Sequence, residues 1–207
     1  MSGAHSRDGT SGSGGLAATA PPAHQPEFDL GGGARLRTIN EEDADELSAV
    51  IAKSRDHLAR WMPWAAGQTL DGTLEFIRQA RKQAADNLGF QRAMTDEGRI
   101  VGTIGFHRVE WEHRLTSIGY WIAQEAQGRG IVTRSVHALT GHALDAWMLN
   151  RVEIRAGVEN LRSRAIPERL GFVQEGVLRE AERVGDRFVD HAVYSMLARE
   201  WTPARQP

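Results

Sequence analysis

The chain has 207 residues, enough for one sizeable hydrophobic core and too few for two comfortable ones. Its formal net charge of −2 argues against nucleic acid as a partner, because proteins that grip nucleic acid usually present a basic face. The absence of cysteine excludes disulfides, thiolate metal sites and a cysteine nucleophile, and it fits a reducing compartment.

The sequence shows neither a membrane-span pattern nor a signal-peptide pattern. No apolar run approaches the ~20 residues of a membrane-spanning helix, and the N-terminus lacks the apolar segment of a signal peptide. We therefore expect a cytoplasmic protein without a membrane partner. Residues 1–33 are mostly Gly, Ser, Ala and Pro, which cannot bury enough surface to offset the entropy lost on ordering. This composition predicts a flexible tail, followed by a single domain over residues 34–207.

The folded part begins with a short strand and two helical segments. Residues 35–39 alternate as a strand would, and Asn40 then precedes an amphipathic helix with an acidic first turn. An aromatic-rich stretch broken by Pro63 follows, and helical spacing returns over residues 69–88.

The period then changes to that of strands. Strands are expected at residues 90–95, 100–109 and 116–122. The remaining elements are a helix from Thr133, a strand at 151–158, a helix at 160–170, strands at 172–178 and 188–197, and a tight turn at 184–187. This order predicts an α/β (α+β) domain, with helices packed on a mixed and mostly antiparallel sheet.

A glycine-containing loop, EAQGRGIVT at residues 125–133, joins the third of these strands to the next helix. A helix N-terminus exposes N–H groups that have no intrahelical partner, and its dipole adds roughly half a positive charge. Gly128 and Gly130 would let successive N–H groups face one spot, where they could hold an anion. Neither a Walker A sequence nor the dinucleotide GxGxxG fingerprint occurs here. By itself the pattern is equally consistent with a plain turn.

The surroundings of the loop resemble a known family. The run QGRGIV at 127–132 is similar to the acyl-CoA loop (Q/R)xxGx(G/A) of the GNAT N-acetyltransferases. GYWI lies just upstream, and ENLRSRAIPERLGF follows about thirty residues later with its N-x-x-S spacing. The stretches RWMPW and DHAVYSMLAREW resemble the RimJ/RimL branch, which acetylates protein N-terminal amines. Val132 departs from the pattern, since Gly or Ala is usual there, but its backbone N–H remains available.

The resemblance implies a GNAT fold with helices on both faces of the sheet, which splays open where acetyl-CoA binds. It also implies which residues contact the coenzyme. Backbone near Trp121 and Ile122 would hold the pantetheine arm, and main-chain amides near the loop would hold the pyrophosphate. The expected coenzyme-binding set is Trp121, Ile122, Gln127, Gly128, Arg129, Gly130, Ile131, Val132, Thr133, Asn160 and Ser163.

Acetyl transfer to an amine needs a neutral amine, a stabilised oxyanion and a proton for the leaving thiolate. Without cysteine, a route through a protein thioester is closed, so direct attack on the bound thioester is expected. The resemblance makes Glu182 the candidate base and Ser163 the candidate acid. Glu182 could instead be a solvated hairpin charge, and Ser163 and Asn160 could simply cap the helix.

His57, Trp61 and Trp64 could form the wall of the acceptor site, although aromatic side chains more often belong to a core. The histidines give no metal pattern, because His137 and His142 are five residues apart and lie on different helix faces. His107, in a predicted strand, is an alternative base or a hydrogen-bonded structural residue. The arginines at 129, 134, 162 and 164 could meet phosphates or only solvent.

These observations predict a metal-free N-acetyltransferase that uses acetyl-CoA, with a protein N-terminal amine as the expected acceptor. The alternatives are a small amine such as a polyamine or aminoglycoside, another donor such as succinyl-CoA, a non-catalytic CoA-binding module and a nucleotide-binding protein. A homodimer is common in the RimJ/RimL branch and is implied by that analogy alone.

Overall fold

The computed structural model describes residues 26–202. Most of the expected flexible tail therefore lies outside the described residues, but its last part does not. Residues 28–31 form a strand that pairs with the strand starting at Ala34, so regular structure begins a few residues before the expected position. Phe28 and Leu30 pack against the main core, which offsets the entropy lost by ordering this glycine-rich hairpin.

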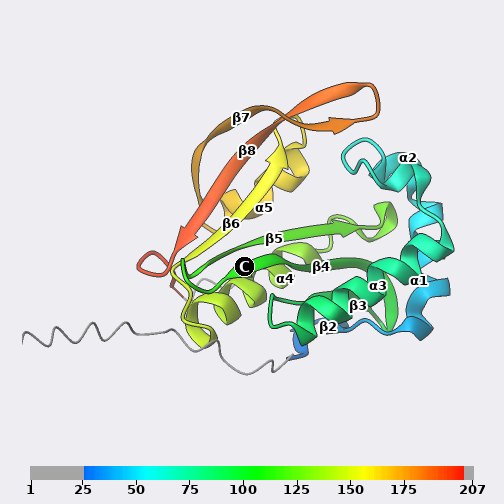
Figure 1. Ribbon diagram of the computed structural model, residues 1–207, viewed down its shortest axis with the longest axis horizontal. Helices are drawn as coiled ribbons and strands as arrows, with labels where there is room; N and C mark the ends of the chain where they lie inside the picture. Colours follow the sequence, from blue (N-terminus) through cyan, green and yellow to red (C-terminus); the bar gives the residue numbers. More distant parts are fainter. Residues whose placement is uncertain (1–25, 203–207) are drawn as a thin grey trace, which may run out of the picture.

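The described residues form one eight-stranded sheet in the order β1-β2-β3-β4-β5-β6-β8-β7. Figure 1 shows β4, β5, β6 and β8 following one another across the molecule. Its neighbours pair antiparallel, except β5 and β6, which pair parallel. The strands are β1 (Phe28–Gly31), β2 (Ala34–Thr38), β3 (Gln91–Asp96), β4 (Arg99–Glu110), β5 (Leu115–Ile122), β6 (Arg151–Gly157), β7 (Val173–Val184) and β8 (Arg187–Leu197). The expected mixed, mostly antiparallel sheet is confirmed.

Helices cover both faces of this sheet, as expected. The helical segments are η1 (Glu41–Asp43), α1 (Ala44–Lys53), α2 (Arg55–Leu58), η2 (Ala65–Gly67), α3 (Leu70–Ala85), η3 (Gln124–Ala126), α4 (Ile131–Gly141), the π-helical turn η4 (His142–Ala146) and α5 (Leu161–Arg169). Figure 1 shows α1 and α3 on the near side of β2–β4, with α4 behind the sheet. Each side has its own core: Leu47 and Ile77 pack on the near side, and Phe106 and Val136 on the far side.

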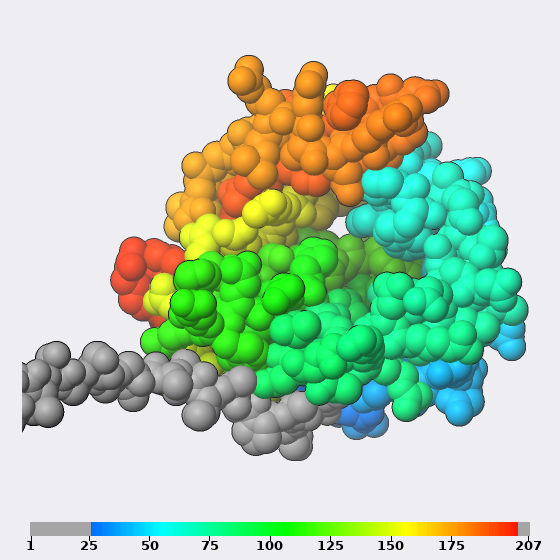
Figure 2. Space-filling view, viewed as in Figure 1, coloured from blue at the N-terminus to red at the C-terminus, as the bar shows by residue number. Residues whose placement is uncertain are grey.

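The sheet opens between β5 and β6. Only three residues of β5 pair with β6, and the last of these pairs is Ser117 with Glu153. Beyond it β5 runs on to Ile122 and β6 to Gly157, and the two strands separate (Figure 1). Figure 2 shows an opening between the cyan surface around α2 and the yellow surface around β6. The splay is therefore present, and it exposes the edge of β5 from Ile118 onward.

Two expected element boundaries need correction. The helix after the glycine loop begins at Ile131, two residues earlier than expected, because Gly130 is its N-cap. The strand after Gly171 runs to Val184, whereas residue 178 was the expected end. Its pairing with β8 is interrupted at two places, so the simple alternation of buried and exposed residues is lost. Glu182 consequently lies inside β7 and does not follow it.

Candidate active site

The glycine loop turns the chain from β5 into α4. Gly128 (φ 76°) and Gly130 (φ 71°) both adopt the left-handed conformation that side chains disfavour. In residues 26–202, none of the backbone hydrogen bonds outside helices and strands is donated by the N–H groups of residues 128–133. Because α4 has 11 residues and begins at Ile131, its positive dipole end adds to these free donors. The loop can therefore bind an anion through its main chain.

The arginine in this loop lines the opening, but its guanidinium is already paired. Arg129 forms an ion pair with Asp96, whose side chain is only 6% exposed, at the turn between β3 and β4. Arg134 bends back and donates to the Arg129 carbonyl oxygen at 3.2 Å. Arg164 contacts the Tyr194 hydroxyl, so its role is structural. A cation that the sequence analysis did not select, Arg169, donates to the Thr133 hydroxyl at 3.1 Å beside the loop.

A cleft of about 1290 Å³ begins at this loop and follows the splayed edge of β5 to α5 and α2. It is large enough for an extended cofactor. The cleft brings together all the coenzyme-binding residues expected from the sequence, together with His57 and Trp61. Trp64 and Glu182 do not line it. Trp64 instead packs edge-on against Trp121, with ring centroids 6.0 Å apart.

The N-terminus of α5 contributes Asn160 and Ser163 to the far wall of the cleft, where Tyr120 of β5 meets Ser163. Asn160 caps the helix, because its side chain accepts the Ser163 N–H at 3.2 Å. Tyr120 on β5 donates its hydroxyl to the Ser163 carbonyl oxygen at 3.1 Å and lies 3.2 Å from the Ser163 Oγ. Burial raises the pKa of Tyr120 well above its usual value, so this hydroxyl stays protonated.

Sequence reasoning did not single out Tyr120, although GYWI was recognised as part of the family pattern. Tyr120 and Ser163 are 43 residues apart, and nothing in their local sequence links them. The alternation of side chains along β5 could have revealed this pair. Ile118 and Tyr120 point to the same face of the sheet, and this is the face that carries α4 and α5, the helix of Ser163.

A chain of hydrogen bonds crosses the entrance of the cleft. The Gln127 side chain lies 2.6 Å from His57 Nε2 and accepts a hydrogen bond from Arg162 at 2.5 Å. Partial burial, followed by the charges of Arg162 and Arg60, lowers the pKa of His57, which favours a neutral imidazole. The side chain of Trp61 lies beside Gly157, with the Arg187 guanidinium 5.5 Å from its ring centroid.

Glu182 lies on the other side of the gap from the glycine loop. It pairs in register with Val189, which packs beside Gly157 close to Trp61. Its carboxylate is 3.3 Å from His191 Nε2, and 39% of its side chain is exposed. The side of β6, β7 and β8 that carries Glu153, Arg155, Glu182 and His191 is called the acceptor face below, after the role proposed for it.

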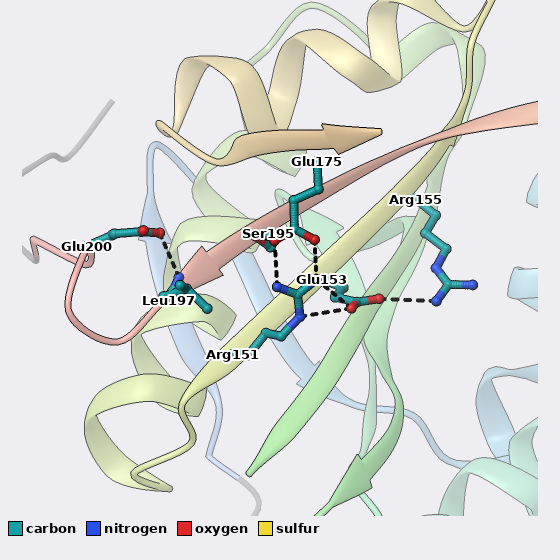
Figure 3. Close-up of polar contacts among 7 residues, drawn as sticks. All are labelled: Arg151, Glu153, Arg155, Glu175, Ser195, Leu197 and Glu200. Atoms are coloured by element: carbon teal, nitrogen blue, oxygen red, sulfur yellow. Dashed lines mark hydrogen bonds and ion pairs between the residues drawn. The ribbon is translucent and has the colours of Figure 1, made fainter. Parts of the chain in front are cut away.

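Other carboxylates on the acceptor face are already paired. Arg151 donates to Glu153 at 2.7 Å and to Glu175 at 2.7 Å, and Ser195 also donates to Glu175 (Figure 3). Arg155 donates to the second oxygen of Glu153 at 3.2 Å. Hydrogen bonds from Arg151 and Ser195 lower the pKa of Glu175 to about 2. This network ties β6 to β7 and β8 beyond the backbone ladder.

Two findings concern residues 26–202 as a whole. No three His, Cys, Asp or Glu side chains in this part gather closely enough to hold a metal ion. None of its helices has the length and apolar character that crossing a bilayer requires.

Comparisons with known proteins agree with this geometry. A family model described as an acetyltransferase (GNAT) domain matches residues 34–173. The putative ribosomal N-acetyltransferase YdaF of Bacillus subtilis (strain 168) is 36% identical over 168 residues, which cover 80% of this chain and 92% of that protein. The ribosomal-protein-serine acetyltransferase of Escherichia coli (strain K12) is 34% identical over 172 residues, covering 78% and 91%.

Solved structures give the same answer. The crystal structure of a probable acetyltransferase superposes with a TM-score of 0.80 at 34% identity, covering 84% of this chain and 98% of that one. The microcin C7 self-immunity acetyltransferase MccE, in complex with acetyl-CoA and AMP, has a TM-score of 0.78 at 26% identity, covering 81% and 94%. The chain therefore belongs to the GNAT family in its RimJ/RimL-like branch, and it is an acetyl-CoA-dependent N-acetyltransferase.

Proposed function

We propose that the acceptor is the α-amino group of a protein N-terminus, most simply that of a ribosomal protein in the cytoplasm. The names of two relatives that each match more than three quarters of this chain support a ribosomal acceptor. The observation that carries the proposal is the acceptor face itself. On this face the Glu182 carboxylate contacts His191 and pairs with no arginine in residues 26–202, whereas Glu153 and Glu175 are neutralised by arginines.

A single carboxylate suits an α-amine better than a polycation. An α-amino group with a pKa near 7.8 is roughly 10% neutral at pH 7, so it needs little help from a base. A lysine amine near 10.4 needs about 3 kcal/mol more. A polyamine would in addition require several free carboxylates along its length, and Arg151 and Arg155 occupy those that this face offers.

The residues divide between the two sides of the gap. On the cleft side, the amides of residues 128–133 would hold the pyrophosphate, the β5 edge near Trp121 and Ile122 the pantetheine arm, and the Asn160 amide nitrogen a pantetheine carbonyl. On the acceptor face, Glu182 would take a proton from the attacking amine. When acetyl-CoA is bound, it supplies the thioester carbon that the amine attacks.

The leaving sulfur needs a proton as the carbon–sulfur bond breaks. In this proposal Ser163 donates it, and Tyr120 then replaces the proton on Ser163, a transfer supported by the 3.2 Å between the two oxygen atoms. Because the pKa of Tyr120 is raised, its hydroxyl group is protonated at neutral pH and can donate that proton to Ser163.

A thiol-release screen tests the proposal. Purified enzyme and acetyl-CoA are incubated with peptides that begin with Ser, Ala or Met, with spermidine and with an aminoglycoside. We expect turnover with free N-terminal peptides, and none with the same peptides blocked at the α-amine but retaining an internal lysine. The assignment of the acceptor would be overturned if spermidine were acetylated faster than the free N-terminal peptides. It would also be overturned if the blocked peptides were acetylated as fast as the free ones.

A further inference from the structure

A bulge in β4 aims the side chain of His107 at the acceptor face. The β4–β5 register passes from Phe106 opposite Ile118 to Val109 opposite Thr116, so His107 and Arg108 together oppose Ser117. Such bulges redirect side chains and often occur beside active sites. Backbone on both sides of the bulge is held in place: Gln83 donates to the His107 carbonyl at 2.7 Å, and the Thr116 hydroxyl donates to the Arg108 carbonyl at 2.9 Å.

The imidazole occupies space that a glycine leaves open. His107 Nδ1 lies 3.0 Å from the Ser117 Oγ. Its other edge covers Gly119, where an added Cβ would lie only 2.5 Å from His107 Nε2. Gly119 does not have a positive φ, so the backbone conformation does not require glycine there. The small residue makes room for the ring two positions beyond Ser117, the last β5 residue that pairs with β6.

Charged side chains on the neighbouring strands β6 and β7 influence the pKa of this imidazole. Desolvation by the surrounding protein is the largest effect and lowers the pKa of His107; the Arg155 guanidinium on β6 lowers it further, and Glu182 on β7 opposes them. The net lowering favours a neutral ring at pH 7. With Nδ1–H donating to Ser117, Nε2 carries a lone pair that can accept a hydrogen bond.

We propose that His107 binds the acceptor amine, with Nε2 accepting one of its N–H groups while Glu182 removes a different proton. The assignment deepens the proposed function and rests on it. The ammonium loses one proton to the Glu182 carboxylate, and its freed electron pair bonds to the thioester carbon. A second N–H points at His107, which fixes the direction of that electron pair. The carbon–sulfur bond then breaks, the sulfur receives its proton from Ser163, and the new amide nitrogen releases its second proton to solvent.

The competing explanation is that His107 only supports the bulge. Gln83 and Thr116 already hold the bulged backbone through hydrogen bonds that do not involve the imidazole. His107 is an exposed residue that belongs to neither hydrophobic core, so packing of apolar surface does not explain its position, although neighbouring groups partly desolvate its ring. A neutral hydrogen-bond acceptor that lies within the electrostatic influence of Glu182 is better explained by a ligand that donates, which is what an amine does.

The test combines kinetics with imidazole NMR on the full chain. We expect His107→Gln to raise the acceptor KM about tenfold, the effect of one lost hydrogen bond, while the Kd for CoA stays unchanged. Ser117→Ala should give a smaller rise in KM. His113→Gln, on the exposed turn that joins β4 to β5, is the matched control and should alter neither constant.

In the ¹⁵N-labelled enzyme saturated with CoA, an N-terminal peptide should shift the Nε2 resonance of His107, and the same peptide blocked at its α-amine should not. An unchanged acceptor KM in a normally folded His107→Gln, or equal shifts with both peptides, would overturn the role of His107. The acceptor assignment fails separately if spermidine is the better substrate. The His107→Gln comparison is then made with spermidine, and an unaltered KM overturns the proposal there too.

Discussion

Replacing Gly130 with valine tests whether main-chain amides of the glycine loop bind the coenzyme. Gly130 is the N-cap of α4 with φ 71°, and an added Cβ would lie 3.1 Å from the end of the Arg134 side chain. That end is flexible and can move, so the backbone conformation dominates the effect. A β-branched residue held in this region costs about 2 kcal/mol.

The exposed loop can escape this strain by leaving the left-handed conformation, which turns its amides away from the cleft. Coenzyme binding must then restore the conformation, and the Kd for CoA should rise about 30-fold, the equivalent of about 2 kcal/mol. Isothermal titration calorimetry measures the Kd, and circular dichroism measures Tm.

Gly185→Val provides the matched control. Gly185 has φ 61° and open space around it, but it lies in the turn between β7 and β8. This variant should lose comparable stability and keep its CoA affinity. If both variants lose the same stability and bind CoA as the parent does, the amides of the loop do not hold the coenzyme.

Three further predictions address the two sides of the gap. Glu182→Gln should reduce turnover on the order of 100-fold at pH 6.5 and several-fold less at pH 8.5, because an α-amine is about 5% neutral at the lower pH and about 80% at the higher. Tyr120→Phe and Ser163→Ala should each lower kcat about tenfold without changing CoA affinity, and the double variant should lose little more, since the two hydroxyls act in series. Glu175→Gln should lower the free energy of unfolding by about 1 kcal/mol at pH 7, a figure discounted because 40% of the Glu175 side chain is exposed. Because the folded pKa of Glu175 is depressed to about 2, this stabilisation is fully present above the ordinary value of 4.5, and the difference from the parent should vanish as the pH falls to about 2.

Each of these measurements has a contrary outcome. For Glu182, equal loss of turnover at the two pH values, or the same loss in the control Glu180→Gln, would exclude a role as base. Fully multiplicative losses for the two hydroxyl variants would separate Tyr120 from Ser163. For Glu175, urea unfolding curves that differ from the parent by the same amount at pH 7 and pH 2.5, or an equal effect of Glu112→Gln, would contradict the ion-pair explanation.

The local sequence predicted the bounds of an element well where that strand or helix has one buried side and one exposed side. In β6, Val152, Ile154 and Ala156 are buried and alternate with Arg151, Glu153 and Arg155, so the strand was predicted within one residue. β7 shows the opposite case. All but two of its residues are exposed and its pairing slips twice, so the alternation that would have extended it to Val184 is absent. Glu182 was therefore expected in the hairpin after this strand, whereas it lies within β7.

The sequence by itself determined the family, the position of the glycine loop ahead of a helix and the residue types available for catalysis. Gly128 and Gly130 could be read directly, because only glycine adopts left-handed backbone at little strain. Tertiary structure alone decided which side chains meet. Tyr120 reaches Ser163, and His107 contacts Ser117, because the strands and helix that carry them are brought together by sheet order and by the divergence of β5 from β6. These contacts join residues far apart in the chain, and they depend on backbone register, which no local pattern of residues encodes.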